Sequence, residues 1–295
     1  MLDAALDRFN RGMIVSGMDH LVSELRRLRD EAPDSWRAFT RDVCRSHPIA
    51  AQLHEDPFTR RSFLKPRGYA GDPEMLDFIF HSGDLPEHTS TRGATIFSYT
   101  TAGPAPRSVR ARAEMMARMI DEMASRRPLR VLAVMAGHLW ETELSQAATE
   151  GGVEKYVAFD QDARTLAAID ARLYGSAITT YQGALRPLFR GKSVFRNFDL
   201  VYSPLCDNLH DATASCFIGA LLNAVAPGGR LIVSNFAPEL VEAGYMEAFM
   251  DWNLIYRNER EMMGLAADVP PEMIAEQRSY RDPYGNITFL EITRG

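Results

Sequence analysis

The feature that most constrains the fold is a regular alternation of short apolar runs and helical segments in the second half of the chain. The apolar runs cover residues 130–134, 153–159, 177–181, 198–203 and 230–235, and helical patterns cover 139–149, 163–174 and 212–225. Short apolar strands that alternate with helices of about 10–15 residues are typical of a doubly wound, mostly parallel α/β sheet. We therefore expect such a sheet here.

The two ends of the chain have different patterns. Before residue 128, apolar residues recur at helical spacing and prolines divide the segment, which ends in an amphipathic helix over 107–126 with its arginine run 107–112 on a solvated face. Near the C-terminus, residues 277–281 and 286–293 flank the turn sequence Asp282-Pro283-Tyr284-Gly285, which predicts an antiparallel hairpin. The predicted domains are a helical extension over 1–127, interpreted as a lid, and a sheet domain over 128–295.

Composition excludes several classes of protein. The chain has 33 Lys and Arg against 39 Asp and Glu, a net charge of −6, so it lacks the basic footprint of a nucleic-acid binder. No apolar run approaches the ~20 residues of a membrane span. Three scattered cysteines, and histidines without metal-ligand spacing, predict neither a disulfide framework nor a metal site. We expect a cytoplasmic location and a small-molecule substrate, with the oligomeric state left open.

Ligands of doubly wound sheets bind beyond the carboxyl ends of the strands, and the residues at those positions suggest a nucleoside. Gly137 would let the backbone approach a ligand, but the turn lacks the G-x-G-x-x-G of a dinucleotide site. Asp160 follows Gly137 by 23 residues and could accept hydrogen bonds from both ribose hydroxyls. Two plainer interpretations stay open, a simple turn at Gly137 and a helix N-cap at Asp160.

The expected cofactor contacts follow four successive strands. They are Ala136, Gly137, His138, Trp140 and Glu141, then Asp160 and Gln161, then Gly183, Ala184 and Leu185, and last Ser203, Pro204 and Leu205. Their order, with the turn Pro227-Gly228-Gly229 before a strand, resembles the class I S-adenosylmethionine-dependent methyltransferases over roughly Leu129 to Gly295. The resemblance implies a Rossmann-like fold and S-adenosylmethionine as cosubstrate.

Two further stretches narrow the resemblance. Lys65–Asp72, together with Asn235–Pro238, Tyr245–Glu247 and Asp251–Arg257, is similar to the family that includes the bacterial 3-hydroxypalmitate methyl ester synthases. Azetidine-2-carboxylate synthases, which cyclise S-adenosylmethionine and release methylthioadenosine, resemble the same family. This chain departs from the family pattern at Trp140, where arginine is expected, and in the rim Pro204–Leu209.

The resemblance implies an enzyme of signal or secondary-metabolite biosynthesis. Methyl transfer to a small carboxylate-bearing acceptor is the first interpretation, and cyclisation of S-adenosylmethionine is the alternative. Both need a carboxylate clamp, a group that orients the nucleophile, and aromatic faces near the sulfonium. The catalytic candidates are Arg67, Tyr69, Tyr99, Asp207 and Tyr256, with Trp140 and Tyr202 as further aromatic faces. Pairing of Arg67 with Asp72 or Glu74 is the competing structural interpretation.

Overall fold

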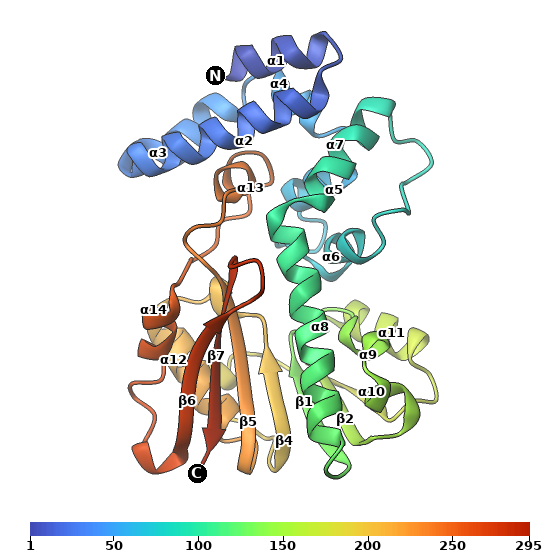
Figure 1. The fold of residues 1–295 in the computed structure, drawn as a ribbon, viewed down its shortest axis with the longest axis vertical. Coiled ribbons are helices and arrows are strands. Elements are labelled where there is room, and N and C mark those ends of the chain that lie inside the picture. The colour runs from blue at the N-terminus through green and yellow to red at the C-terminus, as the bar shows by residue number, and fades with distance from the viewer. The chain divides into compact units, whose positions relative to one another are not determined.

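The computed structural model describes residues 1–295, and its contacts divide the chain into two compact units (Figure 1). The helical unit comprises residues 1–107 and 239–253, and the sheet unit comprises 108–238 and 254–295. This division differs from the predicted boundary at 127/128 in two places. It places most of the 107–126 helix with the sheet, and it joins a later segment, 239–253, to the N-terminal helices.

The helical unit contains no β-strand, as the helical spacing of its apolar residues predicts. Its core side chains include Met18, Leu21, Leu25 and Phe97, which are fully buried. Its helices are α1 (Leu2–Asn10), α2 (Ile14–Glu31), α3 (Pro33–Phe39), α4 (Ile49–Leu53), α5 (Pro57–Leu64), α6 (Pro73–Phe80), α7 (Thr91–Ala102) and α13 (Ala243–Phe249), with a π-helical turn at Thr40–Cys44.

Two sequence motifs that are far apart in the chain meet inside the helical unit. The Lys65 ammonium group donates to the Asp251 carboxylate, which also accepts from Arg45 at 2.5 Å. Gly71 has a φ of +62°, and a Cβ built on it would lie 2.7 Å from Cζ2 of Trp252. The 65–72 loop and the start of the 251–257 segment are therefore one packed structure.

Replacing Gly71 with alanine is expected to destabilise the protein by about 2–4 kcal/mol, because the new methyl group meets the Trp252 ring and the backbone is left-handed. Gly68→Ala is the matched control, since Gly68 also has a positive φ of +89° but a Cβ added there would meet nothing within 4 Å. It should cost only about 1–2 kcal/mol. Urea unfolding measures both, and equal losses would contradict the proposed packing against Trp252.

The sheet unit is built on seven strands in the order β3-β2-β1-β4-β5-β7-β6. Strands β1 to β5 pair in parallel, and β7 runs antiparallel to both β5 and β6. The predicted parallel sheet and C-terminal hairpin are confirmed. The bounds are β1 (Leu129–Val134), β2 (Val153–Asp160), β3 (Ile178–Gln182), β4 (Phe198–Ser203), β5 (Val225–Phe236), β6 (Ile274–Arg281) and β7 (Ile287–Arg294).

The helix expected over 139–149 is interrupted. It forms α9 (Glu141–Leu144) and α10 (Gln146–Glu150), with Ser145 extended between them. The cause is Asp121, whose carboxylate accepts from the Ser145 hydroxyl at 2.6 Å and from the backbone N–H of Ala147 at 2.8 Å. The other helices of this unit are most of α8 (Pro104–Ala124), α11 (Ala163–Arg172), α12 (Asp211–Leu222) and α14 (Glu259–Gly264).

Helix α8 packs lengthwise on one face of the sheet (Figure 1). Near its start the Ser108 hydroxyl donates to Asp282 at 2.8 Å, and further along Met119 contacts the guanidinium of Arg230. The prediction of a solvated face over 107–112 is wrong for Arg110 and Arg112, which are only partly exposed. The packing of α8 against the sheet turns Arg112 inward.

The other face of the sheet carries an apolar core. Alternate strand residues such as Val134, Val157 and Val201 pack there with Phe217 and Leu221 of α12. No helix in the chain combines the length and apolar content that crossing a bilayer requires.

Candidate functional site

The strand order creates a switch point between β1 and β4. The chain leaves β1 toward β2 and β3 on one side, and β4 leads to β5 and β7 on the other. Ligands of open α/β sheets bind in the crevice outside the carboxyl ends of the strands at such a point. The residues after Val134 and after Ser203 therefore mark the candidate site.

The turn after β1 has an unusual backbone. Met135, Gly137 and Leu139 all have left-handed φ values, of 55°, 65° and 57°. A left-handed conformation costs a residue with a Cβ roughly 1–2 kcal/mol, and such strain clusters at functional sites. Burial of the Leu139 side chain holds the conformation in place. Gly137 is thus one of three alternating left-handed positions. The sequence, with a single glycine in this turn, does not predict the other two.

Arg172, at the end of α11, stabilises this turn through hydrogen bonds and a ring contact. Its guanidinium donates to the carbonyl of His138 and to the Glu143 carboxylate, and it lies 4.4 Å from the ring centroid of Trp140. One face of Trp140 is therefore occupied by a cation of the protein itself. The expectation that Trp140 forms part of a cofactor wall stays a prediction, and it concerns the other face or the edge of the ring.

Asp160 ends β2 and is buried. Its carboxylate accepts from the backbone N–H of Asp162 at 2.8 Å, and its carbonyl accepts from Gly183 N at 3.0 Å. The N-cap of α11 is Asp162, which accepts from Arg164 N. The helix-cap interpretation of Asp160 is therefore wrong. Because Asp160 pairs with Gln182 and bonds to Gly183, the predicted ribose and adenine contacts follow neighbouring strand ends. Gln161 and Ala184 are exposed there, and Leu185 is buried.

A buried polar cluster lies on the face of the sheet that α8 covers. Oε1 of Glu141 accepts the hydroxyls of Tyr156, at 3.3 Å, and of Tyr202, and the two hydroxyls also bond to each other. Strand β1 lies between the two tyrosine strands, where Val131 pairs with Tyr156 and Ala133 pairs with Tyr202. Burial raises the pKa of Glu141. The pKa values of Tyr156 and Tyr202 are also raised, first by burial and then by the negative charge of Glu141.

Sequence reasoning named Glu141 and Tyr202 but missed Tyr156 and Arg112. A buried tyrosine in a central strand needs a partner for its hydroxyl, and that rule could have flagged Tyr156. Burial lowers the pKa of Arg112, while the charges of Asp207 and Glu141 act in the opposite direction. Nothing in the amphipathic pattern of α8 marks Arg112, because only the packing of the helix shows which face is buried.

Asp207 lies in the rim after β4 and is buried. Its carboxylate accepts from the Asn208 amide at 2.7 Å. Burial raises its pKa to about 7, although the charges of Arg112 and Arg257 favour the ionised form. A carboxyl group that titrates near neutral pH at a strand end is suited to accept a proton.

Arg257 holds the same rim in place. Its buried guanidinium donates to the carbonyls of Cys206, at 2.8 Å, and Leu209, at 2.6 Å, to Asn235 Oδ1 at 2.8 Å, and to Asp211 at 2.7 Å. The neighbouring Tyr256 is partly buried in the same unit. Ser203, at the last position of β4, has a buried hydroxyl with no hydrogen-bond partner, and Pro204 and Leu205 follow it at the edge of the site.

The other three catalytic candidates belong to the helical unit. Arg67 forms an ion pair with Glu74, one of the two partners that the structural interpretation gave it. Tyr99 donates to Asp19 at 2.8 Å, and burial raises its pKa. Tyr69 is partly buried in the Gly68–Gly71 loop. The expectation that these residues act with the sheet edge stays a prediction, as does the lid.

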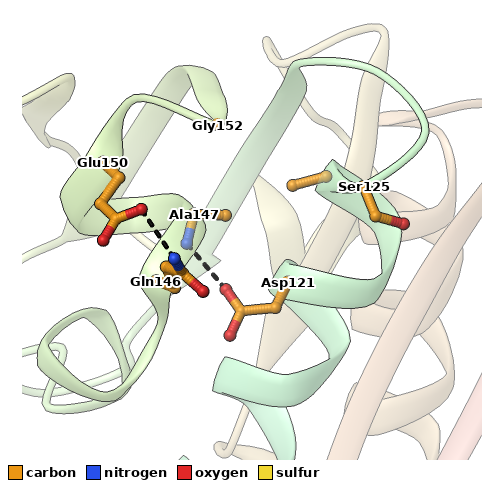
Figure 2. Close-up of a pocket in the computed structure, with 7 residues that line it drawn as sticks. Asp121, Ser125, Gln146, Ala147, Glu150 and Gly152 are labelled. Carbon is orange, nitrogen blue, oxygen red and sulfur yellow. Dashed lines mark hydrogen bonds between the residues drawn. The ribbon is translucent and has the colours of Figure 1, made fainter.

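Figure 2 shows a shallow pocket elsewhere in the sheet unit, between α8 and α10. Asp121 bonds to the Ala147 N–H and Gln146 donates to Glu150 at 2.7 Å, so its polar groups are engaged with each other. Gly152, which precedes β2, places the pocket at the amino ends of the strands. It is therefore not the candidate site.

No group of three or more His, Cys, Asp and Glu side chains is placed to hold a metal ion.

Comparisons with known proteins give a structural likeness without a close sequence relative. No family model and no curated protein matches the chain. A candidate exported protein from Bordetella parapertussis is similar in structure, with a TM-score of 0.59, 16% identity, and coverage of 75% of this chain and 79% of that one. A candidate O-methyltransferase from Nostoc punctiforme has a TM-score of 0.50, 17% identity, and coverage of 83% and 72%. With the observed strand order, these likenesses show the class I methyltransferase fold.

Proposed function

We propose that the protein binds S-adenosylmethionine at the carboxyl edge of its sheet and transfers the methyl group to a small carboxylate-bearing acceptor. The observation that carries the proposal is the switch point between β1 and β4, bordered by a turn with left-handed residues at 135, 137 and 139 and by the buried Asp160. The unpartnered hydroxyl of Ser203 fits a ligand at the same edge.

The residues at this edge have separable roles in the proposal. Asp160 accepts the ribose hydroxyls, and Gly183, Ala184 and Leu185 border the adenine. The turn around Gly137 lets the backbone approach the amino-acid end of the ligand. Bound S-adenosylmethionine supplies an electrophilic methyl carbon on a sulfonium. The protein contributes alignment of the nucleophile and exclusion of water, which supply much of the rate of such displacements.

Asp207 has a role that depends on the nucleophile. A carboxylate oxygen attacks without losing a proton, whereas a hydroxyl or an amine must lose one. Asp207 is at the rim on the β4 side and burial raises its pKa to about 7, so it accepts that proton when the nucleophile carries one. In either case a new bond to the methyl carbon forms as the carbon–sulfur bond breaks, and S-adenosylhomocysteine leaves.

Calorimetric titration with S-adenosylhomocysteine tests the binding step. We expect Asp160→Ala to weaken binding at least 10-fold, because even one hydrogen bond to a charged group contributes about 1.5–3 kcal/mol. Glu154→Ala is the control on the same strand, since Glu154 is exposed at the opposite end of β2. Its binding should match the wild type. Failure of the wild-type protein to bind S-adenosylhomocysteine would overturn the proposal.

Incubation with S-adenosylmethionine alone, followed by mass spectrometry, separates methyl transfer from cyclisation. The methyl-transfer proposal predicts binding with no turnover until a carboxylate-bearing acceptor is added. Enzyme-dependent methylthioadenosine, with an equal amount of a cyclic amino acid, would instead establish the cyclase. The departures at Trp140 and in the rim 204–209 make this the alternative to test.

A further inference from the structure

Arg112 is the cation at this site that the protein does not use in an ion pair or a hydrogen bond of its own. Three carboxylates, those of Asp207, Glu141 and Asp282, act on it electrostatically. Each of them has other donors. Glu141 is held by two tyrosine hydroxyls, and Asp207 by Asn208. The carboxylates therefore keep Arg112 charged without occupying its donors.

The Asp282 carboxylate also has hydrogen-bond donors other than Arg112. It accepts from the Ser108 hydroxyl and from the backbone N–H groups of Tyr284, Asn286 and Ile287, at distances of 2.7–3.0 Å. These bonds shape the β6–β7 hairpin and attach it to α8. Arg112 follows Ser108 by four residues, so it projects from the same face of the helix. Arg112, a partly exposed residue, lies one turn further along α8.

Two contacts fix the level of Arg112 along β5. Met119 contacts Arg230, and Ser108 bonds to Asn286, whose carbonyl accepts from Ala237 just after the strand. Helix and strand therefore run in opposite directions. Seven helical residues and three strand residues both span roughly 10 Å, so Arg112 lies near the level of Val233 and Ser234.

Ser234 provides a second, independent sign of a ligand. It lies two residues beyond Ile232, the register partner of Tyr202, so its side chain points to the face that α8 covers. Ser234 is 3% exposed, and its hydroxyl has no hydrogen-bond partner. A buried hydroxyl without a hydrogen bond lowers the stability of the fold, so such groups are rare. The Ser234 hydroxyl lies at the level of Arg112, whose guanidinium makes no ion pair.

The polar groups around Arg112 other than Glu141 indicate which ligand it binds. The expected nucleoside contacts follow β1, β2 and β3, whereas Asp207, Ser234 and Asp282 belong to β4, β5 and the β6–β7 hairpin. We infer that Arg112, assisted by the Ser234 hydroxyl, holds the carboxylate of the acceptor on the β4–β5 side of the switch point. The inference rests on the proposed function, because it assigns the acceptor half of the same site. A guanidinium can bind a carboxylate through two parallel hydrogen bonds, which orients it as well as holding it.

Arginine footprinting with phenylglyoxal tests this in the wild-type protein. The rate of modification at Arg112 is read by mass spectrometry, and Arg118 on the same helix, which is exposed beside Glu114, serves as the internal control. The probes are butyrate and benzoate, each compared with its neutral amide, added to protein saturated with S-adenosylhomocysteine. We expect at least one carboxylate to slow modification of Arg112 about fivefold or more, while its amide and Arg118 show no change.

Two results overturn the inference. One is modification of Arg112 at the same rate with and without both carboxylates. The other is full protection by S-adenosylhomocysteine alone, which would assign Arg112 to the amino-acid end of the cofactor. Failure of the proposed function is recognised separately, as absence of S-adenosylhomocysteine binding in calorimetry. In that event, protection by the carboxylate probe alone would still show an anion site at Arg112.

Binding variants provide the second readout. Arg112→Met should abolish the carboxylate effect on thermal stability of the S-adenosylhomocysteine complex, Arg112→Lys should keep part of it, and Ser234→Ala should weaken it. Circular dichroism checks that Arg112→Met is folded, because the change removes a positive charge that favours the ionised forms of the buried Asp207 and Glu141 carboxylates. Retention of the full carboxylate effect in Arg112→Met would also overturn the assignment.

Discussion

Replacing Arg257 with methionine is expected to lower the free energy of unfolding by about 3–5 kcal/mol, the usual effect of removing one member of a buried polar network. The change removes the guanidinium donor of the Leu209 carbonyl and of the Asn235 amide oxygen, and it leaves the Cys206 carbonyl only the N–H of Leu209. Since small domains are stable by only about 5–15 kcal/mol, this is a large fraction of the total. Urea unfolding followed by circular dichroism measures it.

Two further variants make the Arg257 experiment specific. Arg257→Lys should recover less than half of the loss, because an ammonium group cannot reach acceptors on both sides of a planar fork. Arg260→Met is the control, since Arg260 is exposed on the adjacent helix α14. A loss for Arg257→Met no greater than that for Arg260→Met would show that the rim does not depend on these bonds.

Asp207→Asn is expected to reduce turnover of S-adenosylmethionine by about 10²–10⁴-fold if the nucleophile passes a proton to this carboxylate, the usual contribution of a general base. The wild-type rate should then fall about tenfold per pH unit below about 7, because burial raises the pKa of Asp207 to about 7 and the protonated form cannot act as a base. Formation of S-adenosylhomocysteine measures both effects. Asp268→Asn, at an exposed position, should behave as the wild type.

A stability measurement separates catalysis from folding in this variant. The pKa of Asp207 is higher in the folded state, so the folded protein binds a proton more tightly than the unfolded chain does. Wild-type stability should therefore decline relative to Asp207→Asn as the pH rises from about 4 to about 7. Unchanged turnover and a flat pH profile in Asp207→Asn would indicate a nucleophile that carries no proton, as a carboxylate does.

The strand–helix alternation was enough to predict the sheet, because the period of apolar residues is a local property of the chain. The residues at the strand ends were predictable for the same reason. Once the strands are parallel, Gly137, Asp160 and Ser203 must reach one edge. The hairpin at 282–285 followed from turn residues alone. Asp162 as the helix cap, with Asp160 left at the strand end, required the observed bonds.

Tertiary structure decided which helix faces are buried and which distant segments meet. Amphipathicity marks a helix but does not show what packs on it, so Arg112 looked solvated in the sequence and is directed inward by the bonds of Ser108 and Met119. The left-handed backbone at Met135 and Leu139 could not be predicted from the sequence either, because glycine is the residue type that indicates such a conformation. Burial of Leu139 holds it without one.

By itself, then, the sequence determined which candidate site residue follows which strand. Gly137, Asp160 and Asp207 could each be assigned because each lies at or just after the end of its own strand. Only the folded chain brought together Glu141, Tyr156 and Tyr202, and only it joined Lys65 to Asp251. These contacts link residues that are 15 to 186 positions apart. Local pattern cannot encode such distances, and they arise when burial of the sheet faces fixes which side chains share the interior.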